Sequence, residues 1–208
     1  MALANRGNQE SREGSEALTA LEEKVRNRTA HVGVMGMGYV GLPTMVSAAQ
    51  ARFNVTGIDI DVSRVASINA GASYIEDVVS DDLTELVAAG KLSATADSSC
   101  IAGLDIVLVC VPTPITKNKE PDLQYMEAAI QALAAHMKTG QLIVLQSTTF
   151  PGTTQEFVLP RLEKSNFQVG KDFCLAFALE RIDPGNIQFH TRSVPKVVGG
   201  ITKRCLKI

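Results

Sequence analysis

From about residue 31 onward, the chain switches repeatedly between two arrangements of apolar and polar residues. Short continuous apolar runs, typical of strands buried on both faces, are followed by segments whose apolar residues recur every three or four positions, as in amphipathic helices. The pattern predicts strands at 31–35, 54–61, 92–97, 104–114, 141–149 and 172–180, and helices at 42–52, 62–71, 80–90, 121–137 and 151–165.

This alternation predicts the fold class. Strands that alternate with helices are joined by right-handed crossovers into a parallel sheet with helices on both faces. We therefore expect an α/β, doubly wound, Rossmann-like domain over residues 29–200.

Residues 1–28 differ from the rest in composition, with ten charged positions among 28. They predict a flexible N-terminal arm, either disordered or helical. Leu18, Leu21 and Val25 have helical spacing, so a short helix can form over 17–28. The arm is expected to be a solvated tail without a role in the fold.

The strongest local motif is the glycine turn Gly36-Met37-Gly38-Tyr39-Val40-Gly41, which follows a predicted strand and opens a helix. In a dinucleotide-binding turn, Gly36 permits the tight turn, Gly38 lets the backbone approach a pyrophosphate, and Gly41 lets the helix pack closely. The free N–H groups of the helix N-terminus then face the phosphates.

An acid at the end of the next strand completes this motif. Asp59 lies 18 residues after Gly41, close to the spacing of a carboxylate that accepts hydrogen bonds from the adenosine ribose. A carboxylate there repels a 2′-phosphate, so the sequence favours NAD over NADP as cofactor. Arg64 leaves two alternatives open, because it could accept a 2′-phosphate or cover the edge of the adenine.

Composition narrows the function classes. A net charge of −2 argues against a nucleic-acid partner, and no apolar run has the length of a membrane span. The first residues do not form a secretory signal, so a cytoplasmic location is expected. Four cysteines and three histidines have no zinc-site spacing and do not suggest a disulfide framework; Cys110 and Cys174 are expected to be buried thiols.

Several segments, in this order, resemble one family: VGVMGMGYVGLP, GIDID, VLVCVPTP, QSTTFPGTT, LERIDPGN and TRSVPKVVGG. Together they are similar to the N-terminal half of the nucleotide-sugar 6-dehydrogenases, the UDP-glucose/GDP-mannose dehydrogenase family. Within it, the last segments are most similar to bacterial UDP-N-acetylglucosamine 6-dehydrogenases of surface-polysaccharide pathways.

The resemblance implies NAD-dependent oxidation of a UDP-sugar at C6, twice, to the uronic acid, through a thioester on a cysteine. In the family that cysteine lies beyond the part that this chain resembles, and residues 201–208 would begin the central helical region. The resemblance thus implies an inactive NAD-binding portion of an enzyme that is a homo-oligomer when complete.

The resemblance also implies roles for individual residues. Tyr39 and Val40 would lie against the pyrophosphate, Thr113 would line the cofactor groove, and Thr148 would position NAD and the hydrolytic water. Glu180 would assist thioester hydrolysis as a catalytic group, with Thr148 beside it. Ala178 and Leu179 replace the serine and proline usual before this glutamate, so we expect a looser loop.

Three alternatives remain at this stage. The chain could be a truncated module that binds NAD without chemistry, or its family could act on UDP-glucose or UDP-N-acetylmannosamine instead. A 3-hydroxyacyl or 6-phosphogluconate type of dehydrogenase shares the fold, but LERIDPGN and TRSVPKVVGG argue against it.

Overall fold

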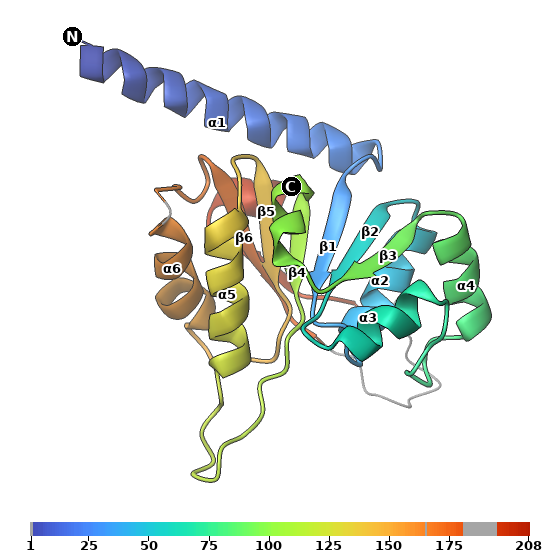
Figure 1. Cartoon of the computed structure of the whole chain (residues 1–208). Coiled ribbons are helices and arrows are strands. Elements are labelled where there is room, and N and C mark those ends of the chain that lie inside the picture. The colour runs from blue at the N-terminus through green and yellow to red at the C-terminus, as the bar shows by residue number, and fades with distance from the viewer. Residues whose placement is uncertain (1, 165, 181–194) are drawn as a thin grey trace.

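A seven-stranded sheet with helices on both faces forms the centre of the structure (Figure 1). The structure is a computed structural model that describes residues 2–164, 166–180 and 195–208, with side chains from Gly14 onward. Its elements are α1 (Ala2–Arg26), β1 (His31–Met35), α2 (Gly41–Gln50), β2 (Asn54–Ile58), α3 (Val62–Asn69), α4 (Ser80–Ala88), β3 (Leu92–Thr95), η1 (Ser98–Gly103), β4 (Ile106–Val109), α5 (Gln124–His136), β5 (Gln141–Leu145), η2 (Thr153–Val158), α6 (Leu159–Glu163), β6 (Phe173–Ala178), β7 (Val198–Gly200) and α7 (Lys203–Lys207).

The strand order is β3-β2-β1-β4-β5-β6-β7, and strands β1 to β6 run parallel. The chain builds outward from β1 to β3, then crosses back to β4 beside β1. This reversal between β1 and β4 is a topological switch point, where ligands of doubly wound sheets bind. The predicted α/β, doubly wound, Rossmann-like fold is confirmed.

The apolar runs form strands because the sheet is covered on both sides. All five residues of β5 are buried. One core cluster lies between the sheet and α5 with α6, and a second lies between the sheet and α2 to α4. Residues at alternate positions of β4 and β5 therefore meet helices on opposite faces.

The N-terminal arm differs from the solvated tail that its charge suggests. It forms the helix α1, which lies along the edge where the parallel strands begin (Figure 1). Leu18 and Leu21 are fully buried in a third cluster against β5, β6 and Cys205 of α7. A salt bridge of 2.7 Å from Lys24 to Asp105 anchors its end. The second half of the arm is therefore part of the core.

Truncating one of these leucines tests the role of the arm. Leu18→Ala should lower the free energy of unfolding by about 3–5 kcal/mol, because it removes a fully buried side chain and leaves a cavity. Urea unfolding of the chain measures this. Leu206→Ala, at a leucine that is 58% exposed, is the matched control and should change stability by less than about 0.5 kcal/mol. Equal stability of Leu18→Ala and the control would show that the arm is dispensable.

The end of the domain holds the features that periodicity did not predict. The predicted helix over 151–165 is a π-helical segment, η2, followed by the short α6. The sheet ends in β7, which pairs with β6 in the antiparallel sense. Among the described residues, no helix is long and apolar enough to cross a membrane.

Candidate functional site

The predicted site residues form one row at the edge where the parallel strands end. Asp59 follows β2, the glycine turn follows β1, Thr113 follows β4, and Thr148 and Glu180 follow β5 and β6. Because the sheet order is β2-β1-β4-β5-β6, the order along this edge is the same. The topology therefore brings all of them to one edge, as an extended dinucleotide site requires.

The backbone of the glycine turn requires its glycines. Gly36 has φ of +88°, and a Cβ there would lie 2.7 Å from the carbonyl oxygen of Cys110. A Cβ on Gly41 would overlap the carbonyl oxygen of Gly36, so α2 begins directly against the turn. Gly38 differs, because its Cβ would meet nothing within 4 Å. It borders open space where a phosphate could approach the backbone.

The entry of α2 fits a phosphate. No side chain caps this helix and its first turn carries no acidic residue, so the positive end of its dipole faces the turn. Tyr39 is 57% exposed and Val40 is half-buried against the core. The residues present therefore fit a dinucleotide pyrophosphate.

Asp59 joins the turn to the next strand. Its carboxylate is buried and accepts hydrogen bonds from the Met37 amide at 2.8 Å and from the Asp61 amide at 3.0 Å. A carboxylate has about four acceptor positions, so it retains capacity for a ribose hydroxyl.

Arg64 lies beside two carboxylates. Its guanidinium lies 3.5 Å from Asp59 and 3.6 Å from Asp61, two carboxylates that compete with any incoming phosphate. Hydrogen bonds from the hydroxyl and amide of Ser63 lower the pKa of Asp61, so that carboxylate stays charged at neutral pH. With two anions around one cation, the local charge disfavours a 2′-phosphate and favours NAD.

Removing this carboxylate should weaken cofactor binding. We expect Asp59→Ala to cost about 1–3 kcal/mol of NAD binding free energy, the scale of losing a charged acceptor from its partners. Calorimetric titration of the purified chain measures it. Asp81→Ala, at an exposed carboxylate on α4, is the control and should bind NAD as the parent does. Parent-like affinity of Asp59→Ala would remove Asp59 from the site.

The two threonines differ in their surroundings. Thr113 Oγ1 is buried and has no hydrogen-bond partner among the described residues, which is costly unless a ligand supplies one. Thr148 is exposed at the end of β5. Thr113 thus fits a groove-lining role. The side chain of Thr148 is accessible to a ligand at the edge where the parallel strands end.

Glu180 lies at the far end of the row in a buried polar cluster. One carboxylate oxygen accepts a short hydrogen bond from the Gln146 amide nitrogen and a salt bridge of 3.1 Å from Lys196. Its side chain is 6% exposed.

The loop before Glu180 is held in a way that its sequence did not suggest. The Leu179 amide donates a hydrogen bond of 3.0 Å to the carbonyl oxygen of Val197, next to Lys196. A proline at this position could not donate it. Leu179 therefore ties the backbone before Glu180 to the segment carrying Lys196, and the looser loop stays a prediction.

Three polar residues of the site were missed by the sequence analysis. Gln146 and Lys196 flank Glu180, and Tyr74 contacts the glycine turn. The sequence did contain one indication of Gln146, which is a polar residue directly after an apolar strand. The motif segments over 181–194 lie outside the described residues.

The cysteines are thiols of the kind expected. Cys110 and Cys174 are buried, and burial raises the pKa of Cys110 to about 12, which leaves it unreactive at neutral pH. Among the described residues, no group of His, Cys, Asp and Glu could hold a metal ion.

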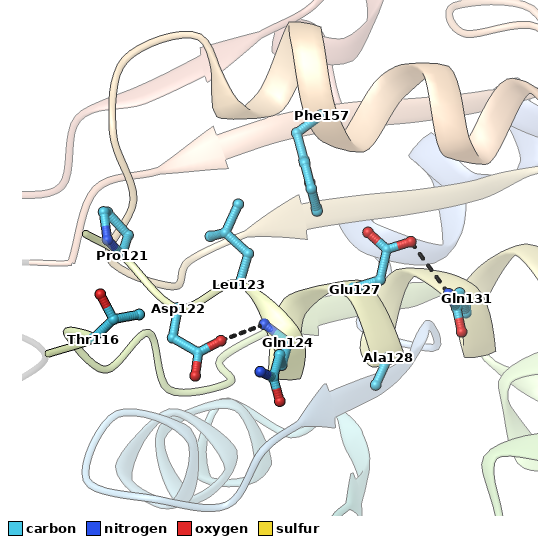
Figure 2. Close-up of a pocket in the computed structure, with 9 residues that line it drawn as sticks. All are labelled: Thr116, Pro121, Asp122, Leu123, Gln124, Glu127, Ala128, Gln131 and Phe157. Atoms are coloured by element: carbon cyan, nitrogen blue, oxygen red, sulfur yellow. Dashed lines mark hydrogen bonds between the residues drawn. The ribbon is translucent and has the colours of Figure 1, made fainter. Parts of the chain in front are cut away.

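A groove of about 460 Å³ lies beside the row, between the start of α5 and η2 (Figure 2). Leu123, Ala128 and Phe157 supply its apolar wall, and Asp122 and Glu127 make it acidic. Arg161 bonds Glu127 at 2.8 Å and covers the ring of Phe157. The groove shares no lining residue with the predicted cofactor site.

Comparison with known proteins agrees with this geometry. Residues 30–208 match the model of the UDP-glucose/GDP-mannose dehydrogenase family, NAD binding domain. The UDP-N-acetyl-D-glucosamine 6-dehydrogenase of Pseudomonas aeruginosa is 36% identical over 172 residues, which are 82% of this chain and 40% of that protein. The UDP-N-acetyl-D-mannosamine dehydrogenase of Pyrococcus horikoshii is 33% identical over 178 residues, 85% of this chain and 42% of that protein.

Solved structures show the same fold. The NDP-N-acetyl-D-galactosaminuronic acid dehydrogenase of Methanosarcina mazei superposes with a TM-score of 0.82 at 33% identity, over 90% of this chain and 42% of that one. The chain spans about two fifths of the length of these relatives. With the match over residues 30–208, the chain belongs to the UDP-glucose/GDP-mannose dehydrogenase family and contains its NAD-binding domain.

Proposed function

We propose that this chain is the cofactor domain of an NAD-dependent nucleotide-sugar 6-dehydrogenase. Its substrate is a UDP-N-acetylhexosamine, and UDP-N-acetylglucosamine in particular, which is oxidised at C6 to the uronic acid for polysaccharide precursor synthesis. The observation that carries the proposal is the row from Asp59 to Glu180 along one edge of the sheet. Asp59 lies at one end of this row, and the buried side chain of Glu180 lies at the other.

Each residue of the row has a role that follows from its position along the edge. Asp59 accepts from the adenosine ribose, and the glycine turn with the α2 N-terminus faces the pyrophosphate. Thr113 offers its unpartnered hydroxyl farther along the groove. NAD, when bound, accepts hydride from the alcohol carbon.

Glu180 acts at the nicotinamide end of this row. Gln146 and Lys196 hold one of its oxygens, so the position of the carboxylate is fixed. A fixed carboxylate can orient a water and take its proton while the acyl group is attacked. Thr148, after the neighbouring strand β5, is placed to position the same water.

The relatives differ in the sugar that their names specify. Their names specify N-acetylglucosamine, N-acetylmannosamine and N-acetylgalactosaminuronic acid. UDP-glucose and UDP-N-acetylmannosamine are the alternative substrates. A module that binds NAD without chemistry is the alternative function for the 208 residues taken alone.

The experiment compares substrates in a polypeptide that also carries the family's catalytic cysteine. Each UDP-sugar is incubated with NAD, and NADH absorbance is followed. We expect the highest kcat/KM with UDP-N-acetylglucosamine and two NADH per sugar. A preference for UDP-N-acetylmannosamine or UDP-glucose would overturn the sugar assignment, and no NADH with any UDP-sugar would overturn the activity.

The 208-residue chain is the control in this experiment. It should form no NADH with any of these sugars, because none of its four cysteines lies in a glycine-rich catalytic-cysteine motif. Sustained NADH formation by the chain alone would place the whole catalytic machinery within it.

A further inference from the structure

A tyrosine outside every sequence motif holds the glycine turn. Tyr74 lies in the loop between α3 and α4, and its hydroxyl donates a hydrogen bond of 2.6 Å to the carbonyl oxygen of Met37. The two residues are 37 positions apart in the sequence. The contact therefore joins the α3–α4 loop to the centre of the turn.

The two peptide groups on either side of Met37 are both held by side chains. The amide before its Cα donates to Asp59 at 2.8 Å, and the carbonyl after it accepts from Tyr74. Arg64 lies between the two partners, 3.5 Å from the Asp59 carboxylate and 5.8 Å from the centre of the Tyr74 ring. Met37, Asp59, Arg64 and Tyr74 thus form one cluster.

The carbonyl that Tyr74 holds belongs to the same peptide group as the Gly38 N–H. In a trans peptide the C=O and N–H bonds point in opposite directions. Fixing the Met37 carbonyl toward Tyr74 therefore directs the Gly38 N–H away from that loop. Gly38 is also the glycine of the turn whose Cβ would meet nothing within 4 Å, so its surroundings are open to a ligand.

We propose that Tyr74 is a positioning residue of the cofactor site, which orients the Gly38 N–H as a hydrogen-bond donor to the dinucleotide pyrophosphate. The proposal rests on the glycine turn as the pyrophosphate site. It assigns Tyr74 to the phosphates through the backbone, without direct contact with them.

The chemistry of the phenol suits this task. Partial burial raises the pKa of Tyr74 to about 12, so the hydroxyl keeps its proton and remains a donor throughout the physiological range. The Arg64 guanidinium lies over the ring, 5.8 Å from its centre, and 36% of Tyr74 is exposed.

The test removes only the hydroxyl. Tyr74→Phe should weaken binding of NAD and of ADP, which both contain a pyrophosphate, by about 5- to 20-fold, the ratio expected when an orienting hydrogen bond is lost. Binding of adenosine, which has no phosphate, should change less than about twofold. Calorimetry with NAD and NMR titration with ADP and adenosine measure these ratios in the 208-residue chain.

Two controls separate positioning from folding. Tyr125→Phe removes a hydroxyl from a tyrosine that is 45% exposed on α5 and should bind all three ligands as the parent does. The thermal unfolding midpoint of ligand-free Tyr74→Phe should stay within about 2 °C of the parent, and Tyr74→Leu serves as a second variant that also lacks the donor.

The outcomes are distinguishable. Parent-like NAD affinity of Tyr74→Phe would overturn the proposal, as would an equal loss for adenosine and ADP, which would place Tyr74 against the adenine instead. If the parent itself bound neither NAD nor ADP, the pyrophosphate site would be wrong and the role of Tyr74 would fall with it.

Discussion

Glu180→Gln should slow turnover by about 10²- to 10⁴-fold in a polypeptide that also carries the family's catalytic cysteine, because the variant keeps the size of the side chain and loses the base. Its acyl-enzyme should accumulate and appear as a mass shift on that cysteine. NAD affinity should be nearly unchanged, since Glu180 lies at the opposite end of the row from Asp59. Single-turnover kinetics and intact-protein mass spectrometry measure both effects.

The control for this variant is Glu85→Gln, at an exposed glutamate on α4, which should turn over at the parent rate. Turnover of Glu180→Gln at the parent rate would contradict the role of Glu180 as base, as would an effect on NAD affinity alone.

A proline is usual in the family at the position of Leu179. The Leu179 amide donates to Val197, so restoring the proline at this position would remove a hydrogen bond between the Glu180 loop and the Lys196 segment. Leu179→Pro should therefore not speed turnover.

Gly38→Ala should weaken NAD binding by about 1–3 kcal/mol, roughly 5- to 150-fold, without lowering the stability of the ligand-free chain. The added methyl group enters open space in the free protein, and the same space is where the pyrophosphate must approach the backbone. Calorimetry gives the affinity, and urea unfolding gives the stability.

Gly103→Ala is the matched control, since a Cβ there also meets nothing within 4 Å and the residue lies in η1, before β4. It should leave NAD affinity unchanged. If both variants bound NAD as the parent does, the open space at Gly38 would not be the phosphate site.

The parts of this molecule that the sequence predicted are those encoded by local pattern. The turn from Gly36 to Gly41 is one short segment, so spacing identified it, and φ of +88° at Gly36 gives the physical reason. Asp59 was predicted because the next strand ends at a nearly constant number of residues after such a turn.

Contacts between distant segments were not predictable in this way. Tyr74 reaches Met37 across 37 residues from a loop with no periodicity. The spacing of Leu18 and Leu21 predicted a helix, but not the packing of this helix against β5 and β6. Lys196 meets Glu180 only because β7 turns back antiparallel beside β6.

The glycine turn and Asp59 should form an NAD site, which titration with both nicotinamide cofactors tests. NAD and NADP are each titrated calorimetrically into the 208-residue chain at the same ionic strength. We expect one NAD per chain, bound more tightly than NADP, because Asp59 and Asp61 surround Arg64 and disfavour a 2′-phosphate. Equal or tighter binding of NADP, or no binding of NAD, would contradict the account.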